Sequence, residues 1–128
     1  MVKLLFVCGS PRKASTAYAM EEARKGAESV EQVQVDMLYL QNRKIAPCIH
    51  CDACIRKETT GCVLYHDDME DWNQRFFTYD GVLIGTAVYE MGMTPQLSSF
   101  LSRFRSEYLN QRQNPFLRMY LPGAALAV

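Results

Sequence analysis

The feature that most constrains the fold is an apolar run over residues 2–9, in which only Lys3 is polar. A strand with apolar residues on both faces is typical of a parallel sheet that helices cover on two sides. The run stops at Gly9-Ser10-Pro11, and beyond it apolar residues recur at the spacing of one helix face: Met20, Ala23, Ala27 and Val30. A buried strand that leads directly into an amphipathic helix indicates an α/β protein.

The middle of the chain continues this alternation. Apolar residues at every second position of residues 33–39 predict a half-exposed strand at a sheet edge. Asp67-Asp68 is expected to begin a helix, because acidic residues are favourable at the positive end of a helix. The buried stripe of that helix is predicted to be Met69, Trp72, Phe76 and Tyr79.

The C-terminal part adds two strands and one helix. Residues 81–89 predict a further buried strand, and residues 124–128 begin a fourth apolar run. Between them a helix is expected from Thr94-Pro95, a cap followed by proline, to Asn114-Pro115. Strands that alternate with helices in this order predict a doubly wound parallel sheet.

Size and charge exclude several classes of function. The 128 residues suit a single domain, and the 14 Lys+Arg balance the 14 Asp+Glu. This balance argues against a nucleic-acid-binding protein, and no apolar stretch is long enough to span a membrane. The N-terminus also lacks the pattern of a signal peptide. We therefore expect a cytoplasmic protein whose partners include neither nucleic acid nor membrane.

The first loop, residues 9–16, follows the first strand, where doubly wound sheets bind ligands. It matches neither the dinucleotide nor the nucleotide-triphosphate glycine motif. It offers the hydroxyl groups of Ser10, Ser15 and Thr16, the Arg12 guanidinium and the N–H groups of a helix N-terminus. Such a set suits a single phosphate dianion. The alternative is that Ser15 and Thr16 only cap the helix.

The second loop, residues 86–93, follows the third strand and is expected beside the first loop at the switch point of the sheet. Tyr89 in this loop is suited to lie against a planar ring. Backbone amides of the loop would then reach the heteroatoms of that ring. The alternative is that Tyr89 is the last residue of the strand and packs on the core.

The cysteine segment, residues 41–66, has no useful periodicity and holds four of the five cysteines within 15 residues. Three cysteines at two-residue intervals, with a fourth nearby, suit a cubane iron–sulfur cluster. Four thiolates also suit zinc, and unligated or disulfide-paired thiols are a third alternative. The cysteines concerned are Cys48, Cys51, Cys54 and Cys62.

The other candidate groups have simpler interpretations. Cys8 lies within an apolar strand and is expected to be a buried, inert thiol. His50 and His66 flank the cysteines and are interpreted as surface residues. Four arginines are interpreted as a solvated face, with an NADPH phosphate or an acidic partner as the alternative: Arg103, Arg105, Arg112 and Arg118.

Taken together, these segments resemble the NADPH-dependent FMN reductase and iron–sulfur flavoprotein group of flavodoxin-like proteins. The resemblance covers essentially the whole chain. It is carried by Val7-Cys8 and the first loop, the cysteines, Asp67-Asp68-Met69, and Val88-Tyr89 before Pro95-Gln96-Leu97. This chain departs from the family pattern at Ala87, where proline is usual, and at Ser98 and Ser102, where Lys and Asp are common.

The resemblance implies a flavodoxin-like α/β sheet of strand order 2-1-3-4 and two cofactors. The FMN phosphate would be held by Ser10, Arg12, Ser15 and Thr16. The isoalloxazine ring would be flanked by the second loop, at Ala87, Val88, Tyr89, Glu90 and Gly92. The cofactor at Cys48, Cys51, Cys54 and Cys62 would be a [4Fe–4S] cluster.

We therefore expect an FMN-dependent oxidoreductase or electron-transfer flavoprotein, similar to NAD(P)H:flavin or quinone reductases. Electrons would pass between NAD(P)H or a reduced carrier, the flavin and the cluster. No catalytic residue is assigned, because flavin chemistry needs no acid or base from the chain. The alternative from another class is a non-catalytic, zinc-stabilised α/β interaction module.

The last apolar run bears on domain organisation. We expect residues 1–128 to form one FMN-binding domain that carries the cysteine segment as an insertion. A strand over residues 124–128 would leave an exposed sheet edge of the kind that proteins avoid. A fifth strand beyond Val128 or a neighbouring subunit is expected to cover this edge. We therefore expect a homo-oligomer or a longer chain rather than a stable 14.6 kDa monomer.

Overall fold

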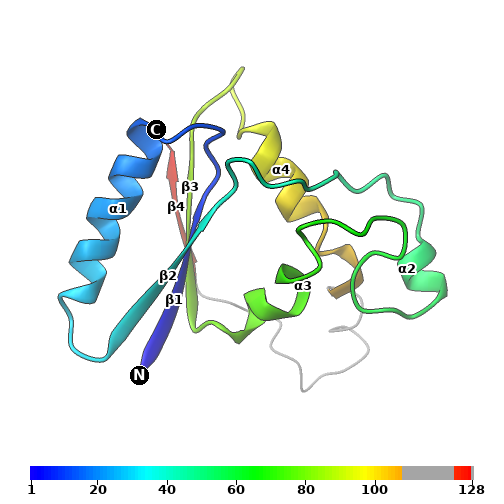
Figure 1. Ribbon diagram of the computed structural model, residues 1–128, viewed down its shortest axis with the longest axis horizontal. Helices are drawn as coiled ribbons and strands as arrows, with labels where there is room; N and C mark the ends of the chain where they lie inside the picture. The colour runs from blue at the N-terminus through cyan, green and yellow to red at the C-terminus, as the bar shows by residue number, and fades with distance from the viewer. Residues whose placement is uncertain (108–122, 128) are drawn as a thin grey trace.

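A computed structural model describes residues 1–107 and the backbone of residues 123–127. Its four strands are β1 (Val2–Cys8), β2 (Val33–Tyr39), β3 (Gly81–Thr86) and β4 (Gly123–Ala127), which form one parallel sheet. The strand order is β2-β1-β3-β4 (Figure 1). The order 2-1-3-4 predicted for a flavodoxin-like sheet is therefore confirmed, and so is the edge position of β2.

Helices cover both faces of this sheet (Figure 1). Helix α1 (Ser15–Glu28) lies on one face. The other face carries α3 (Trp72–Arg75), the 3-10 helix η1 (Phe76–Thr78) and α4 (Pro95–Ser102). The short helix α2 (Ala53–Arg56) belongs to the cysteine segment and lies beyond α4, away from the sheet. No described helix is long and apolar enough to cross a membrane.

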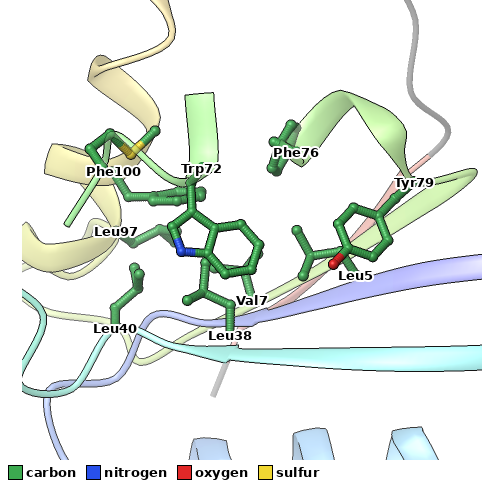
Figure 2. Close-up of a cluster of buried hydrophobic side chains, with 10 residues drawn as sticks. Leu5, Val7, Leu38, Leu40, Trp72, Phe76, Tyr79, Leu97 and Phe100 are labelled. Carbon is green, nitrogen blue, oxygen red and sulfur yellow. The ribbon is translucent and has the colours of Figure 1, made fainter. Parts of the chain in front are cut away.

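The alternation of side chains along β1 divides the core into two layers. Leu5 and Val7 face α3 and α4, and they pack with a large apolar cluster (Figure 2). Phe6 and Cys8 point to the opposite face, toward α1. The thiol of Cys8 is 1% exposed, and burial raises its pKa, so the prediction of a buried thiol is confirmed. The larger cluster contains Leu38, Leu40, Met69, Trp72, Phe76, Tyr79, Leu97 and Phe100.

The helix expected from Asp67-Asp68 is only partly present. Its predicted stripe is buried throughout, but regular helix begins at Trp72 and changes to a 3-10 turn at Phe76. The Asp67 carboxylate accepts hydrogen bonds from the N–H groups of Ala46 and Met69, at 2.9 and 3.2 Å. Asp67 therefore joins two distant segments and does not begin a long helix, and turns carry the chain from it to Trp72.

The ends of the other two helices also differ from expectation. Val30 was expected on the buried face of α1, but the helix ends at Glu28 and Val30 is 60% exposed. The Ser29 hydroxyl donates to the Gly26 carbonyl at 2.6 Å and closes this end. Helix α4 begins at Pro95 as predicted but ends at Ser102, where residues 103 and 104 form a turn, so one continuous helix to Asn114-Pro115 is wrong. Asn114-Pro115 itself lies outside the described residues.

Candidate functional site

The first loop connects β1 to α1 at the carboxyl edge of the sheet. The N-cap of α1 is Ala14, and no side chain accepts a hydrogen bond from the first helical turn. The interpretation of Ser15 and Thr16 as caps is therefore wrong. Because the first N–H groups of a helix have no partner within it, this helix presents uncapped donors to the loop.

The four phosphate-binding candidates occupy two different environments in the first loop. Ser10 and Thr16 are buried, at 5% and 3% exposure, whereas Arg12 and Ser15 face solvent. The Ser10 hydroxyl accepts a hydrogen bond from the Arg12 N–H at 3.3 Å. The first loop thus offers the buried hydroxyl groups of Ser10 and Thr16 and the exposed guanidinium of Arg12.

The second loop is a tight hairpin with an exposed tip. The N–H and carbonyl groups of Tyr89 pair with those of Gly92, at 2.8 and 2.9 Å. Glu90 and Met91 form the turn with φ values of 46° and 67°, a conformation that L residues rarely adopt. Tyr89 is 42% exposed, so its interpretation as a core residue is wrong. Val88 and Met91 are exposed as well.

Direct contacts hold these two loops side by side. The Gly9 N–H donates to the Gly85 carbonyl at 2.7 Å, which continues the pairing of β1 with β3. The fully buried Thr94 hydroxyl donates to the Gly9 carbonyl and accepts from the Leu97 N–H at 3.3 Å. A Cβ atom at Gly9 would lie 2.9 Å from the Cβ of Leu97. Close packing at Gly9 therefore sets the spacing of the loops.

The four clustered cysteines line a single pocket, as their sequence spacing suggested. Burial raises the pKa of the Cys54 thiol, and the neighbouring thiols of Cys62 and Cys48 raise it further. Within the described part of the chain, no three Cys, His, Asp or Glu side chains are arranged to hold a metal ion. The thiols are therefore gathered but not in ligand positions, so metal binding would require the cysteine segment to rearrange.

Three polar side chains at or just after the C-terminal end of α4 hold the cysteine segment in place. The Ser102 hydroxyl accepts from the Cys48 N–H, and the Ser106 hydroxyl accepts from the Gly61 N–H, both at 3.0 Å. The Arg105 Nε donates to the Asp52 carboxylate at 2.9 Å. Polar residues on one short stretch thus contact both ends of the cysteine-bearing loop.

A buried ion pair completes this attachment. Arg103 donates from Nη1 and Nη2 to the two oxygens of Asp67, at 2.6 and 3.1 Å, and from Nη1 to the Ala46 carbonyl at 2.9 Å. The side chain of Arg103 is 2% exposed and that of Asp67 is 13% exposed. The guanidinium also lies 5.3 Å from the centre of the Tyr65 ring. The interpretation of Arg103 as part of a solvated face is therefore wrong.

The pKa of Asp67 reflects opposing effects. Burial alone would raise the pKa of this carboxyl group, but the hydrogen bonds from Arg103 and from the Ala46 and Met69 N–H groups outweigh burial. The pKa is therefore lowered from its ordinary value of 3.8, so the carboxylate stays ionised beside Arg103.

The remaining candidates behave more simply. His50 and His66 are exposed, as predicted, and His66 Nδ1 lies 2.6 Å from a Glu70 carboxylate oxygen. Arg105 is one-third exposed, while Arg112 and Arg118 lie outside the described residues. Thr94 and Asp67 were predicted only as helix starts, so sequence reasoning missed their long-range contacts.

Comparison with protein families gives a match over nearly the whole chain. The model of the NADPH-dependent FMN reductase family matches residues 2–127. An iron–sulfur flavoprotein of Methanocaldococcus jannaschii is 36% identical over 132 aligned positions, which cover 99% of this chain and 61% of that protein. An iron–sulfur flavoprotein of Methanosarcina thermophila is 28% identical and is covered to 63%, again by 99% of this chain. The chain thus spans about three-fifths of the length of these relatives.

Solved structures agree with the fold. An NADH:FMN oxidoreductase (EmoB) in its apo form superposes with a TM-score of 0.63 at 14% identity, over 99% of this chain and 76% of that one. A flavone reductase superposes with a TM-score of 0.61 at 21% identity, over 89% of this chain and 36% of that one. These similarities show the flavodoxin-like α/β fold predicted from the sequence.

Proposed function

This chain belongs to the NADPH-dependent FMN reductase family, and from that premise we propose that it binds FMN and acts as an oxidoreductase. The observation that carries the proposal is the pairing of the first and second loops at the carboxyl ends of β1 and β3, through Gly9 and Thr94. Doubly wound sheets bind their ligands at this switch point. NAD(P)H or a reduced carrier is the proposed electron donor.

The first loop is the proposed phosphate site. Its uncapped helix N-terminus and the hydroxyl groups of Ser10, Ser15 and Thr16 supply donors to a dianion, and Arg12 adds the charge. Because Ser10 and Thr16 are buried in place, their hydroxyl groups lose little freedom when the phosphate binds. This arrangement supports the phosphate site that the sequence predicted.

The second loop is the proposed ring site. Its hairpin leaves the Tyr89 side chain 42% exposed next to the first loop, where it is available to a planar ring. The proposed contacts are Ala87, Val88, Tyr89, Glu90 and Gly92. Bound FMN supplies hydride and electron transfer, while the chain positions the ring and tunes it.

The cysteine pocket is the proposed site of a [4Fe–4S] cluster. Four thiols on one pocket are the ligand set of such a cluster, and two arginines, Arg103 and Arg105, line the same pocket and favour its negative charge. The names of the two archaeal relatives, both iron–sulfur flavoproteins, support this proposal. Homo-oligomerisation and a cytoplasmic location remain predictions.

One absorption spectrum tests the proposal. Protein purified without oxygen should be yellow from the flavin bands and should show a broad brown shoulder from the cluster. FMN without iron, after anaerobic reconstitution with iron and sulfide, would refute the cluster and keep the flavoprotein. A colourless protein with stoichiometric zinc would refute both and favour the zinc-stabilised interaction module.

A further inference from the structure

Arg103 carries a buried N–H group that no acceptor in the described residues satisfies. Its Nη1 and Nη2 atoms donate to Asp67 and Ala46, whereas its Nε atom is buried and has no hydrogen-bond acceptor among residues 1–107 and 123–127. The side chain is 2% exposed. A buried donor that lacks an acceptor is costly and uncommon in folded proteins, above all on a charged group. The Nε group therefore calls for an acceptor that the described part of the chain does not supply.

The surroundings of Arg103 indicate what that acceptor is. Arg103 lines the pocket that Cys48, Cys51, Cys54 and Cys62 also line. A cluster bound there would bring thiolate and sulfide sulfurs, which carry negative charge and accept hydrogen bonds from N–H groups. We propose that Arg103 donates its Nε–H to a sulfur of this cluster; the inference rests on the cluster proposed above.

The ion pair with Asp67 prepares Arg103 for this role. Two hydrogen bonds to Asp67 and one to the Ala46 carbonyl fix the plane of the guanidinium before any cofactor binds. A fixed donor loses little entropy when it meets the sulfur. Because the reduced cluster is more negative than the oxidised one, this hydrogen bond stabilises the reduced form and raises the reduction potential.

Arg105 provides a matched control on the same pocket. It is also a lining residue, but its Nε already donates to Asp52 at 2.9 Å, and its side chain is one-third exposed. Replacing either arginine with lysine keeps the positive charge and removes the Nε–H group. Comparing the two variants therefore distinguishes the effect of a hydrogen bond on the reduction potential of the cluster from the electrostatic effect of a nearby positive charge.

The test is a redox titration of the intact, anaerobically reconstituted protein, followed by EPR. Arg103→Lys should favour the oxidised cluster about tenfold more than wild type does, a fall of about 59 mV for one electron. Arg105→Lys should leave the potential unchanged. Asp67→Asn loosens the same ion pair but keeps the Nε–H group, so any fall in the potential should be smaller than that of Arg103→Lys.

A second measurement covers the case in which Arg103→Lys does not fold. Pulsed EPR on Arg105→Lys protein labelled with ¹⁵N-arginine should show a weak ¹⁵N coupling to the reduced cluster. Equal shifts in the two lysine variants, or no ¹⁵N coupling, would overturn the role of Arg103 while leaving the cluster in place. Wild-type protein that takes up no iron would instead refute the cluster itself, and with it this inference.

Discussion

The two flavin loops and the cysteine segment differ in how they are built. Main-chain pairing of β1 with β3 and the tie between Thr94 and Gly9 position the loops. The cysteine segment has one short helix and is held by side chains at the end of α4 and by the pair Asp67–Arg103. Helix α4 joins the two regions, with Thr94 at one end and Ser102 at the other (Figure 1).

This difference bears on how each region meets a ligand. The loops take their shape from the sheet, so a flavin would find its site already formed. The cysteines share a pocket without being in ligand positions, so a cluster would complete its own site. Metal binding that finishes the folding of an irregular segment is common among metalloproteins. Loss of one cofactor should therefore affect the two regions very unequally.

Removing one cysteine should give the largest effect. Replacing Cys48, Cys51, Cys54 or Cys62 with Ala should abolish most of the bound iron and leave FMN bound, because the loops belong to a different part of the fold. Iron and flavin contents of anaerobically purified protein measure this. Cys8→Ala, which changes a buried thiol in β1, should keep the iron. Joint loss of iron and FMN would show that the two regions are not independent.

Breaking the ion pair should give the next largest effect. Asp67→Ala leaves the buried Arg103 without its counter-ion and should cost about 3–5 kcal/mol of the free energy of unfolding. Limited proteolysis should then cut the cysteine segment first. Asp68→Ala removes a carboxylate that accepts from the Lys44 N–H at 2.7 Å and should cost only about 0.5–1.5 kcal/mol. Similar losses in denaturant titrations of the two variants would contradict the central role of Arg103.

Changes in the first loop should lower FMN affinity with little effect on iron. Arg12→Ala or Thr16→Ala should each weaken binding roughly ten- to hundredfold, because each removes a charge-assisted contact worth about 1.5–3 kcal/mol. Fluorescence titration with FMN measures this. Lys13→Ala is the control, since that ammonium lies 4.7 Å from the Tyr39 ring centre. Full affinity in both loop variants would show that the phosphate binds elsewhere.

The smallest of these effects should be the loss of stability at low pH that follows from protonation of Asp67. The pKa of Asp67 is lowered from its ordinary value of 3.8, so its stabilising contribution is complete above that value. The contribution is lost as the pH falls through the lower pKa of the folded protein. The free energy of unfolding should therefore fall below about pH 4 more steeply in wild type than in Asp67→Asn. Parallel pH profiles for the two proteins would contradict this assignment.

The sequence by itself determined the elements whose signal is local. Apolar spacing predicted the four strands and the buried stripe from Met69 to Tyr79, because burial in a helix or strand follows its own period. The strand order was predicted from the family resemblance, not from local spacing. The spacing of the cysteines likewise indicated that all four lie near one another, because residues this close in sequence are also close in space. All four line one pocket.

Tertiary structure decided the polar contacts between distant residues. Arg103 meets Asp67 across 36 positions, and Thr94 meets Gly9 across 85. Neither pairing has a local pattern, and a lone arginine or threonine in a sequence is most often exposed. These residues become buried because the fold brings their partners to them, and a buried polar group is stable only when it is paired. The helix expected from Asp67 is shortened for a related reason. The Asp67 carboxylate accepts hydrogen bonds from Arg103 and from the Ala46 N–H group, and regular helix begins only at Trp72.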